Sequence, residues 1–126
     1  MAGERILVVE DNELNMKLFR DVLIATGYRA LEATTGGEAV GLAVAHTPDL
    51  VLMDIQLPDA DGVEVLRRLR ADDRTAAIPV LAVTAQAMLG DRERFLAAGF
   101  DGYVSKPLNV GELIGTVQQH CGGSAR

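Results

Sequence analysis

The sequence predicts an α/β fold in which a parallel β-sheet is covered by helices on both faces. Short, nearly continuous apolar runs alternate with stretches whose apolar residues recur every three or four positions. Such runs are typical of strands buried on both faces, and parallel strands need helical crossovers to connect them. Five strand–helix pairs fill the 126 residues, a length that is usual for one domain.

Five segments are predicted as strands. Four are apolar runs at residues 6–9, 50–53, 80–83 and 102–104. The fifth, at residues 28–33, alternates apolar and polar positions and is more ambiguous. It follows a glycine and begins with Tyr28, which favours a strand.

Five segments are predicted as helices, at residues 13–26, 38–46, 63–70, 88–98 and 110–120. In the first of them, one face carries Leu14, Leu18, Val22 and Ala25, with Phe19 and Leu23 beside it. Glycine or proline follows four of these segments closely and ends them, at Gly27, Pro48, Gly99 and Gly122.

The charge and hydropathy patterns exclude several classes of protein. The net charge of −6 argues against nucleic acid or anionic membranes as partners, since both are bound mainly through Lys and Arg. The longest uncharged run, residues 75–90, is shorter than the roughly 20 apolar residues of a membrane-spanning helix. The N-terminus lacks a signal-peptide pattern, so we expect a cytoplasmic protein. A single cysteine, Cys121, allows neither an intramolecular disulfide nor a cysteine-based metal site.

Carboxylates follow two of the predicted strands, at the edge where open parallel sheets bind ligands. Glu10 and Asp11 follow the first strand, and Asp54 follows the third. If these strands are neighbours, three carboxylates meet, and their repulsion favours a bound cation. Oxygen ligands without His or Cys suit Mg²⁺, with room for a phosphate oxygen. For Glu10 and Asp11 alone, a solvated turn in which Asp11 or Asn12 caps the next helix is the simpler interpretation.

Three further polar residues lie near the ends of the later strands. Lys106 supplies a cation that suits a phosphoryl oxygen or a carboxylate, and a purely structural ion pair with Asp54 is the alternative. The Thr84 hydroxyl either donates to a phosphoryl oxygen or caps the following helix. Tyr103 has an apolar ring with a polar tip, and a lone aromatic of this kind is usually part of the core.

Four motifs together resemble the receiver domain of bacterial two-component response regulators. They are residues 6–12 (ILVVEDN), 52–58 (LMDIQLP) with Asp61 and Gly62, 83–85 (VTA), and 103–107 (YVSKP). The resemblance covers about residues 4–121, which we take as the core of a single receiver domain spanning residues 1–126, with a flexible tail at 122–126. Residues 10–17 and 53–58 look most like the DivK group of single-domain cell-cycle regulators.

The resemblance implies a flavodoxin-like (βα)5 doubly wound fold with a five-stranded parallel sheet of order 2-1-3-4-5. It implies that Asp54 accepts a phosphoryl group from a histidine kinase or a histidine phosphotransfer protein. Asp11 and Asp54, with Glu10 and the Gln56 backbone carbonyl, would hold Mg²⁺. Lys106 would pair with the phosphoryl group, and its bond to Pro107 would be cis.

The resemblance also implies how the signal leaves the protein. Thr84 would bond a phosphoryl oxygen, and Tyr103 would turn inward into the space that this opens. Because no output domain follows Cys121, we expect output through binding of an effector to the fourth helix, fifth strand and fifth helix. The chain would be a phosphorylation switch rather than a turnover enzyme, and a monomer or weak homodimer.

Two glutamines depart from what rapid dephosphorylation requires. Gln56 and Gln86 occupy positions that tune the lifetime of the acyl phosphate in this family, and neither can activate water as an acid or base. We therefore expect slow self-dephosphorylation.

Three alternative functions compete with this interpretation, and the sequence argues against each of them. A phosphatase of the dehalogenase type needs an acid two residues after the nucleophile, where this chain has Gln56. A flavin carrier needs a phosphate-binding loop after the first strand, where Glu10 and Asp11 would repel phosphate. A phosphate-independent interaction module would not need the complete set of site residues, and only the presence of that set argues against it: Asp54, Asp11, Thr84 and Lys106.

Overall fold

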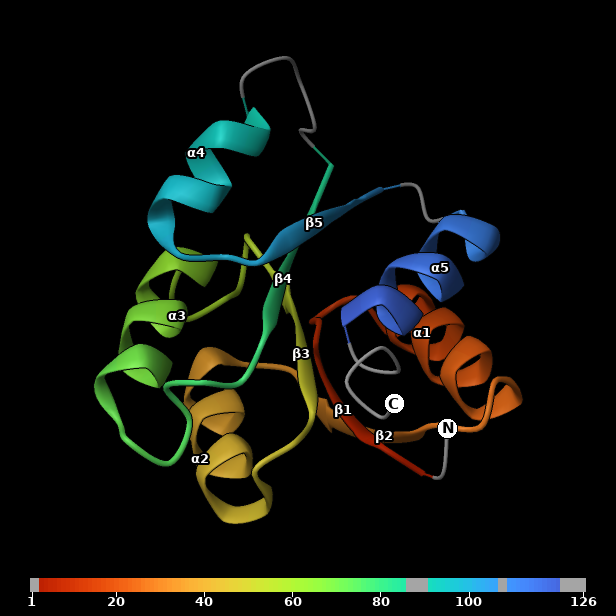
Figure 1. The fold of residues 1–126 in the computed structure, drawn as a ribbon, viewed down its shortest axis with the longest axis horizontal. Coiled ribbons are helices and arrows are strands. Elements are labelled where there is room, and N and C mark those ends of the chain that lie inside the picture. Colours follow the sequence, from red (N-terminus) through yellow and green to blue (C-terminus); the bar gives the residue numbers. More distant parts are fainter. Residues whose placement is uncertain (1–2, 86–90, 107–108, 121–126) are drawn as a thin grey trace.

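The computed structural model describes residues 3–85, 91–106 and 109–120, without the side chains of residues 91 and 92. Strands and helices alternate along the described chain (Figure 1). The strands are β1 (Arg5–Val9), β2 (Arg29–Ala33), β3 (Leu50–Asp54), β4 (Val80–Thr84) and β5 (Gly102–Ser105). The helices are α1 (Glu13–Ala25), α2 (Gly36–His46), α3 (Gly62–Ala71), α4 (Asp91–Ala98) and α5 (Val110–His120).

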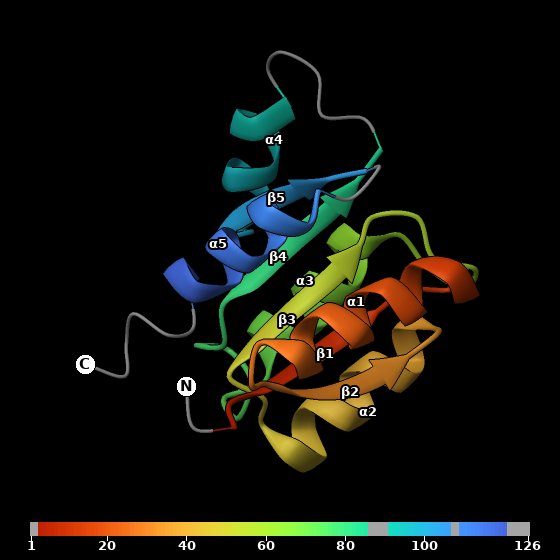
Figure 2. The same cartoon turned by 90° about the vertical axis from the view of Figure 1, so that its right-hand side faces the viewer.

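The strands form one parallel sheet in the order β2-β1-β3-β4-β5. Helices α1 and α5 cover one face, and α2, α3 and α4 cover the other (Figures 1 and 2). The predicted fold class and strand order are confirmed. Strand order reverses between β1 and β3, so a ligand site is expected at the carboxyl ends of these two strands.

Alternation along β1 divides the core between the two faces of the sheet. Ile6 and Val8 pack on the side of α1 and α5, whereas Leu7 and Val9 pack on the side of α2, α3 and α4. This is the period of two that a β-strand imposes on its side chains. None of the helices in the described part of the chain is both long and apolar enough to cross a lipid bilayer.

The buried face of α1 matches the predicted one only in part, since Val22, Phe19 and Leu23 are buried as expected. Its buried residues are Met16, Phe19, Val22 and Leu23. Leu14, expected to face the core, is 78% exposed, and Ala25 is exposed as well. The helix offers two apolar stripes, and burial of the large Phe19 ring favours the stripe that contains it, because the free energy of burial grows with apolar area.

Capping residues explain the ends of the helices. Thr35 caps α2, which begins at Gly36, two residues before the predicted start. Gly27 has the positive φ of 94° that was expected after α1.

Residues 28–33, the ambiguous segment, form strand β2 from residue 29 onward. The predicted start of the fourth helix at Met88 lies outside the described residues, as does the tail.

Candidate functional site

The parallel register brings the ends of β1 and β3 together. Val9 is opposite Met53, so Glu10, which follows β1, lies beside Asp54, the last residue of β3. The backbone N–H of Glu10 donates to the carbonyl of Ala33 and holds this end of β1 against β2. The sheet thus places the carboxylates on neighbouring strands.

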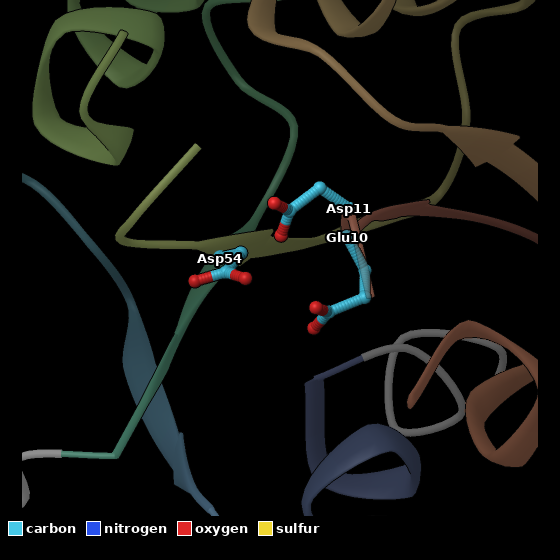
Figure 3. Close-up of side chains that lie close together, drawn as sticks. All are labelled: Glu10, Asp11 and Asp54. Atoms are coloured by element: carbon cyan, nitrogen blue, oxygen red, sulfur yellow. The ribbon is translucent and has the colours of Figure 1, made fainter. Parts of the chain in front are cut away.

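Three carboxylates gather at this edge of the sheet. Glu10, Asp11 and Asp54 each offer a carboxylate oxygen, and these oxygens lie within 4.8 Å of one another. Figure 3 shows the three side chains around one space. Glu10 is only 1% exposed and Asp54 only 4%, whereas Asp11 is exposed. Like charges this close, two of them buried, require a compensating cation.

Lys106 supplies part of that compensation. Its Nζ lies 3.1 Å from Asp54 Oδ2 and 3.1 Å from Glu10 Oε1. The other oxygen of Asp54, Oδ1, accepts a hydrogen bond of 2.9 Å from the backbone N–H of Gln56. Asp54 is therefore held in one orientation from both sides.

Burial and charge shift the pKa values of two of these groups. Burial, and then repulsion from Asp54, raises the pKa of Glu10 above its ordinary value, against the opposing effects of Asn12 and Lys106. Burial alone would lower the pKa of Lys106, but attraction to Asp54 and Glu10 outweighs it and raises that pKa. Lys106 therefore remains a cation at neutral pH. Further positive charge near Glu10 would stabilise the ionised form of its buried carboxyl group.

The donor set fits a hard divalent cation. Every group that offers a ligand atom is a carboxylate, which is the ligand type that Mg²⁺ prefers. Among the described residues, Glu10 Oε1 is buried and accepts no hydrogen bond, although it is in ionic contact with Lys106. A buried carboxylate oxygen without a hydrogen bond is costly, and a cation between the carboxylates would satisfy it.

Asn12, and not Asp11, caps the first helix. The Asn12 side chain accepts a hydrogen bond of 3.0 Å from Asn15 N, and its own backbone N–H donates to Glu10 Oε2. Of the two capping residues that the sequence allowed, the structure selects the second. The carboxylate of Asp11 thus remains directed at the acidic cluster.

An open cleft of about 530 Å³ lies over Asp54. It is lined by Asp11, Asn12, Asn15, Asp54, Gln56, Leu57, Pro58 and Lys106. Leu57 and Pro58 belong to the 52–58 motif and Asn15 to residues 10–17, but none of the three was assigned a role at the site from the sequence, because apolar and amide side chains do not by themselves indicate a ligand. The cleft gives a small anionic group access to Asp54.

Neither Thr84 nor Tyr103 is among the residues that line this cleft. Thr84 ends β4 and is buried, and its backbone carbonyl accepts a hydrogen bond of 2.8 Å from Lys106 N. The half-buried ring of Tyr103 packs toward α4, with its centroid 6.4 Å from that of Phe95. Pro107 and Gln86 lie outside the described residues.

The fold and the acidic cleft define a class of signalling domain, and the chain belongs to the response regulator receiver domain family, whose model matches residues 6–118. It is 51% identical over 117 residues to the polar-differentiation response regulator DivK of Brucella anthropi. The matched region covers 93% of this chain and 95% of that protein. The DivK of Brucella ovis is 50% identical over the same length.

A solved structure supports the same assignment. The receiver domain of sensor histidine kinase PA1611 from Pseudomonas aeruginosa PAO1 is 39% identical, with a TM-score of 0.87, over 96% of this chain and 99% of that one. Its structure has a magnesium ion coordinated in the active-site cleft.

Proposed function

We propose that this response regulator accepts a phosphoryl group on Asp54 from a histidine kinase or histidine phosphotransfer protein, in a Mg²⁺-dependent reaction. The observation that carries the proposal is the placement of Asp54 in an open cleft, 3.1 Å from Lys106 and clustered with Glu10 and Asp11. The similarity to DivK proteins supports it.

The reaction asks for positioning more than for covalent chemistry. A carboxylate oxygen of Asp54 attacks phosphorus, the phosphorus–nitrogen bond to the donor imidazole breaks, and the imidazole leaves with that electron pair. Lys106, held between Glu10 and Asp54, lies where it can neutralise a phosphoryl oxygen. Glu10, Asp11, Asp54 and the Gln56 carbonyl would hold Mg²⁺, which supplies further positive charge to the transferred group.

Phosphorylation then changes the surface that a partner protein can bind. Phosphorylation adds about −1.5 to −2 charge, and the Thr84 hydroxyl bonds a phosphoryl oxygen while Tyr103 turns inward. In support, Tyr103 lines a hollow of about 680 Å³ between α4, β5 and α5, together with Leu96 and Glu112. We assign effector binding to this surface. Loss of effector binding in a Leu96→Ala, Glu112→Ala double variant that is still phosphorylated would support it, and unchanged binding would contradict it.

Removal of the phosphoryl group is slow in this proposal. Gln56 is exposed at the cleft and has no ionisable group with which to activate water. The isolated phosphoprotein should retain its label for minutes or longer. A half-life of seconds would contradict this part of the proposal.

Intact mass after incubation with a small phosphodonor tests the acceptor residue. Wild-type protein with Mg²⁺ should gain one phosphoryl group, and neither the Asp54→Asn variant nor wild-type protein with chelator should gain it. If a known receiver domain is labelled in parallel and this folded chain is not, the phosphate-independent interaction module becomes the better interpretation.

A further inference from the structure

Asp59 joins the loop after the proposed phosphorylation site to a different helix. It lies in the loop between β3 and α3, five residues after Asp54. Its Oδ1 accepts a hydrogen bond of 2.7 Å from Gly36 N, and its Oδ2 accepts one of 3.1 Å from Gly37 N. One carboxylate therefore binds the first two N–H groups of α2.

These N–H groups are a strong site for a carboxylate. The first N–H groups of a helix have no partner within the helix, and the positive end of the helix dipole lies there. The next N–H, of Glu38, is already bonded to the Thr35 hydroxyl, so Asp59 completes the cap. The two glycine N–H groups lower the pKa of Asp59, which is therefore ionised at neutral pH.

Close approach of α2 to α3 makes this contact possible. A Cβ atom at Gly36 would lie only 2.7 Å from Val65 Cγ2, so a larger residue would require Val65 or the start of α2 to shift. The same Cβ would lie 3.4 Å from Asp59 Oδ1. The absence of a side chain at Gly36 thus brings the start of α2 within hydrogen-bonding distance of the loop.

The loop that Asp59 holds forms one wall of the site cleft. Gln56, Leu57 and Pro58 line the cleft. The loop is fixed at its start by the bond from Gln56 N to Asp54 Oδ1, and at its end by Asp61, which caps α3 through Glu64 N. Between these points, Asp59 attaches the loop to α2.

We propose that Asp59 is a positioning residue for the cation site: by attaching the loop to the N-terminus of α2, it holds the Gln56 carbonyl where a divalent cation can use it. The inference rests on the proposed function, because it takes the Gln56 carbonyl as a ligand. It predicts that Mg²⁺ affinity depends on a side chain that does not touch the cation.

Mg²⁺ titration of the metal-free full chain, followed by backbone amide NMR, tests this role. Asp59→Ala should weaken Mg²⁺ binding by about tenfold, the lower end of the effects known for residues that orient metal ligands. The Mg²⁺ affinity of Asp59→Asn should fall between those of wild type and Asp59→Ala, because the amide oxygen of the asparagine can still accept one hydrogen bond from a glycine N–H. Thermal unfolding of each variant shows that binding is measured on folded protein.

The control must separate positioning from the loss of a negative charge. Asp73→Ala removes the same charge from an exposed residue beyond the other end of α3. Repeating the titrations in about 1 M NaCl, where the Debye length is about 3 Å, suppresses long-range charge effects. The weakening by Asp59→Ala should persist in high salt, and Asp73→Ala should match wild type there.

The outcomes distinguish this inference from the function on which it rests. Wild-type protein that binds no Mg²⁺ would overturn both. Wild-type protein that binds Mg²⁺, with an Asp59→Ala variant of equal affinity in high salt, would overturn the positioning role alone. A lower melting temperature with unchanged Mg²⁺ affinity would likewise reduce Asp59 to a helix cap.

Discussion

Gly62 lies directly against the backbone of Asp54. A Cβ atom at Gly62 would come within 2.7 Å of the Asp54 carbonyl oxygen and 3.0 Å of the Ile55 Cα. The Gly62 N–H also donates to the carbonyl of Ile55 over 2.8 Å. The start of α3 is thus packed against the residue that we propose as the phosphoryl acceptor.

We predict that Gly62→Ala destabilises the fold although alanine favours helices. The added methyl group meets backbone atoms that cannot move aside, and overpacking of this kind costs about 1–3 kcal/mol. Urea unfolding should show that loss, and the displaced Asp54 should be phosphorylated more slowly. Gly41→Ala is the control: nothing lies within 4 Å of its Cβ position, so it should stabilise α2 by about 0.5–1 kcal/mol. Equal effects of the two substitutions would contradict the steric argument.

The ion pairs of Lys106 should stabilise the metal-free protein. Lys106→Met leaves Glu10 and Asp54 without their cation, and we expect a loss of roughly 2–3 kcal/mol, below the usual cost of a broken buried pair because Lys106 is 20% exposed. Added Mg²⁺ should reduce the difference in the free energy of unfolding between wild type and Lys106→Met, since the ion compensates the same carboxylates. Lys17→Met, which breaks a pair whose side chains are 64% and 56% exposed, should change stability little. A loss that Mg²⁺ leaves unchanged would argue against a shared site.

Arg70 connects three parts of the chain. Its guanidinium donates to the carbonyls of Ala76, Ile78 and Gly99 and to Asp101 Oδ2. A single ammonium group cannot reach all four oxygens, so Arg70→Lys should lower the free energy of unfolding by about 1–3 kcal/mol. Arg67→Lys, at a position 75% exposed, should stay within about 0.5 kcal/mol of wild type. If chemical denaturation gives both variants wild-type stability, the network contributes nothing.

Asp72 should make stability depend on pH under acidic conditions. Hydrogen bonds from the Arg74 side chain and backbone lower its pKa from 3.8 to about 2. Between these values the unfolded chain binds more protons than the folded one, so stability falls as the pH falls. The difference in the free energy of unfolding between wild type and Asp72→Asn should therefore be constant above about pH 5 and become smaller as the pH drops below 4 toward 2. Urea unfolding across this range measures it, and a constant difference down to pH 3 would contradict the prediction.

The fold could be predicted from local patterns in the sequence. Burial on both faces leaves continuous apolar runs such as β3 and β4, and the helix period leaves apolar residues three and four positions apart. The acidic site could be predicted on the condition that the first and third strands are neighbours, which the family resemblance implied and the sheet confirms, since parallel strands end at one edge.

Other features depended on contacts between segments far apart in the chain. The buried face of α1 was predicted only in part: Val22, Phe19 and Leu23 are buried, but Leu14 and Ala25 are exposed, because packing of Phe19 against the sheet sets the rotation of the helix. Asp59 gave no signal, because its partner Gly36 is 23 residues away and offers only a backbone N–H.

Amino-acid order therefore specified the elements, the order in which they occur and the residue types at the strand ends, since these follow from backbone geometry and burial within short segments. Tertiary structure alone set the distances: Lys106 lies 3.1 Å from Asp54 across 52 residues, because register across β3, β4 and β5 brings the ends of β3 and β5 to the same edge. Such a distance depends on how all the strands pair, and no local pattern encodes it.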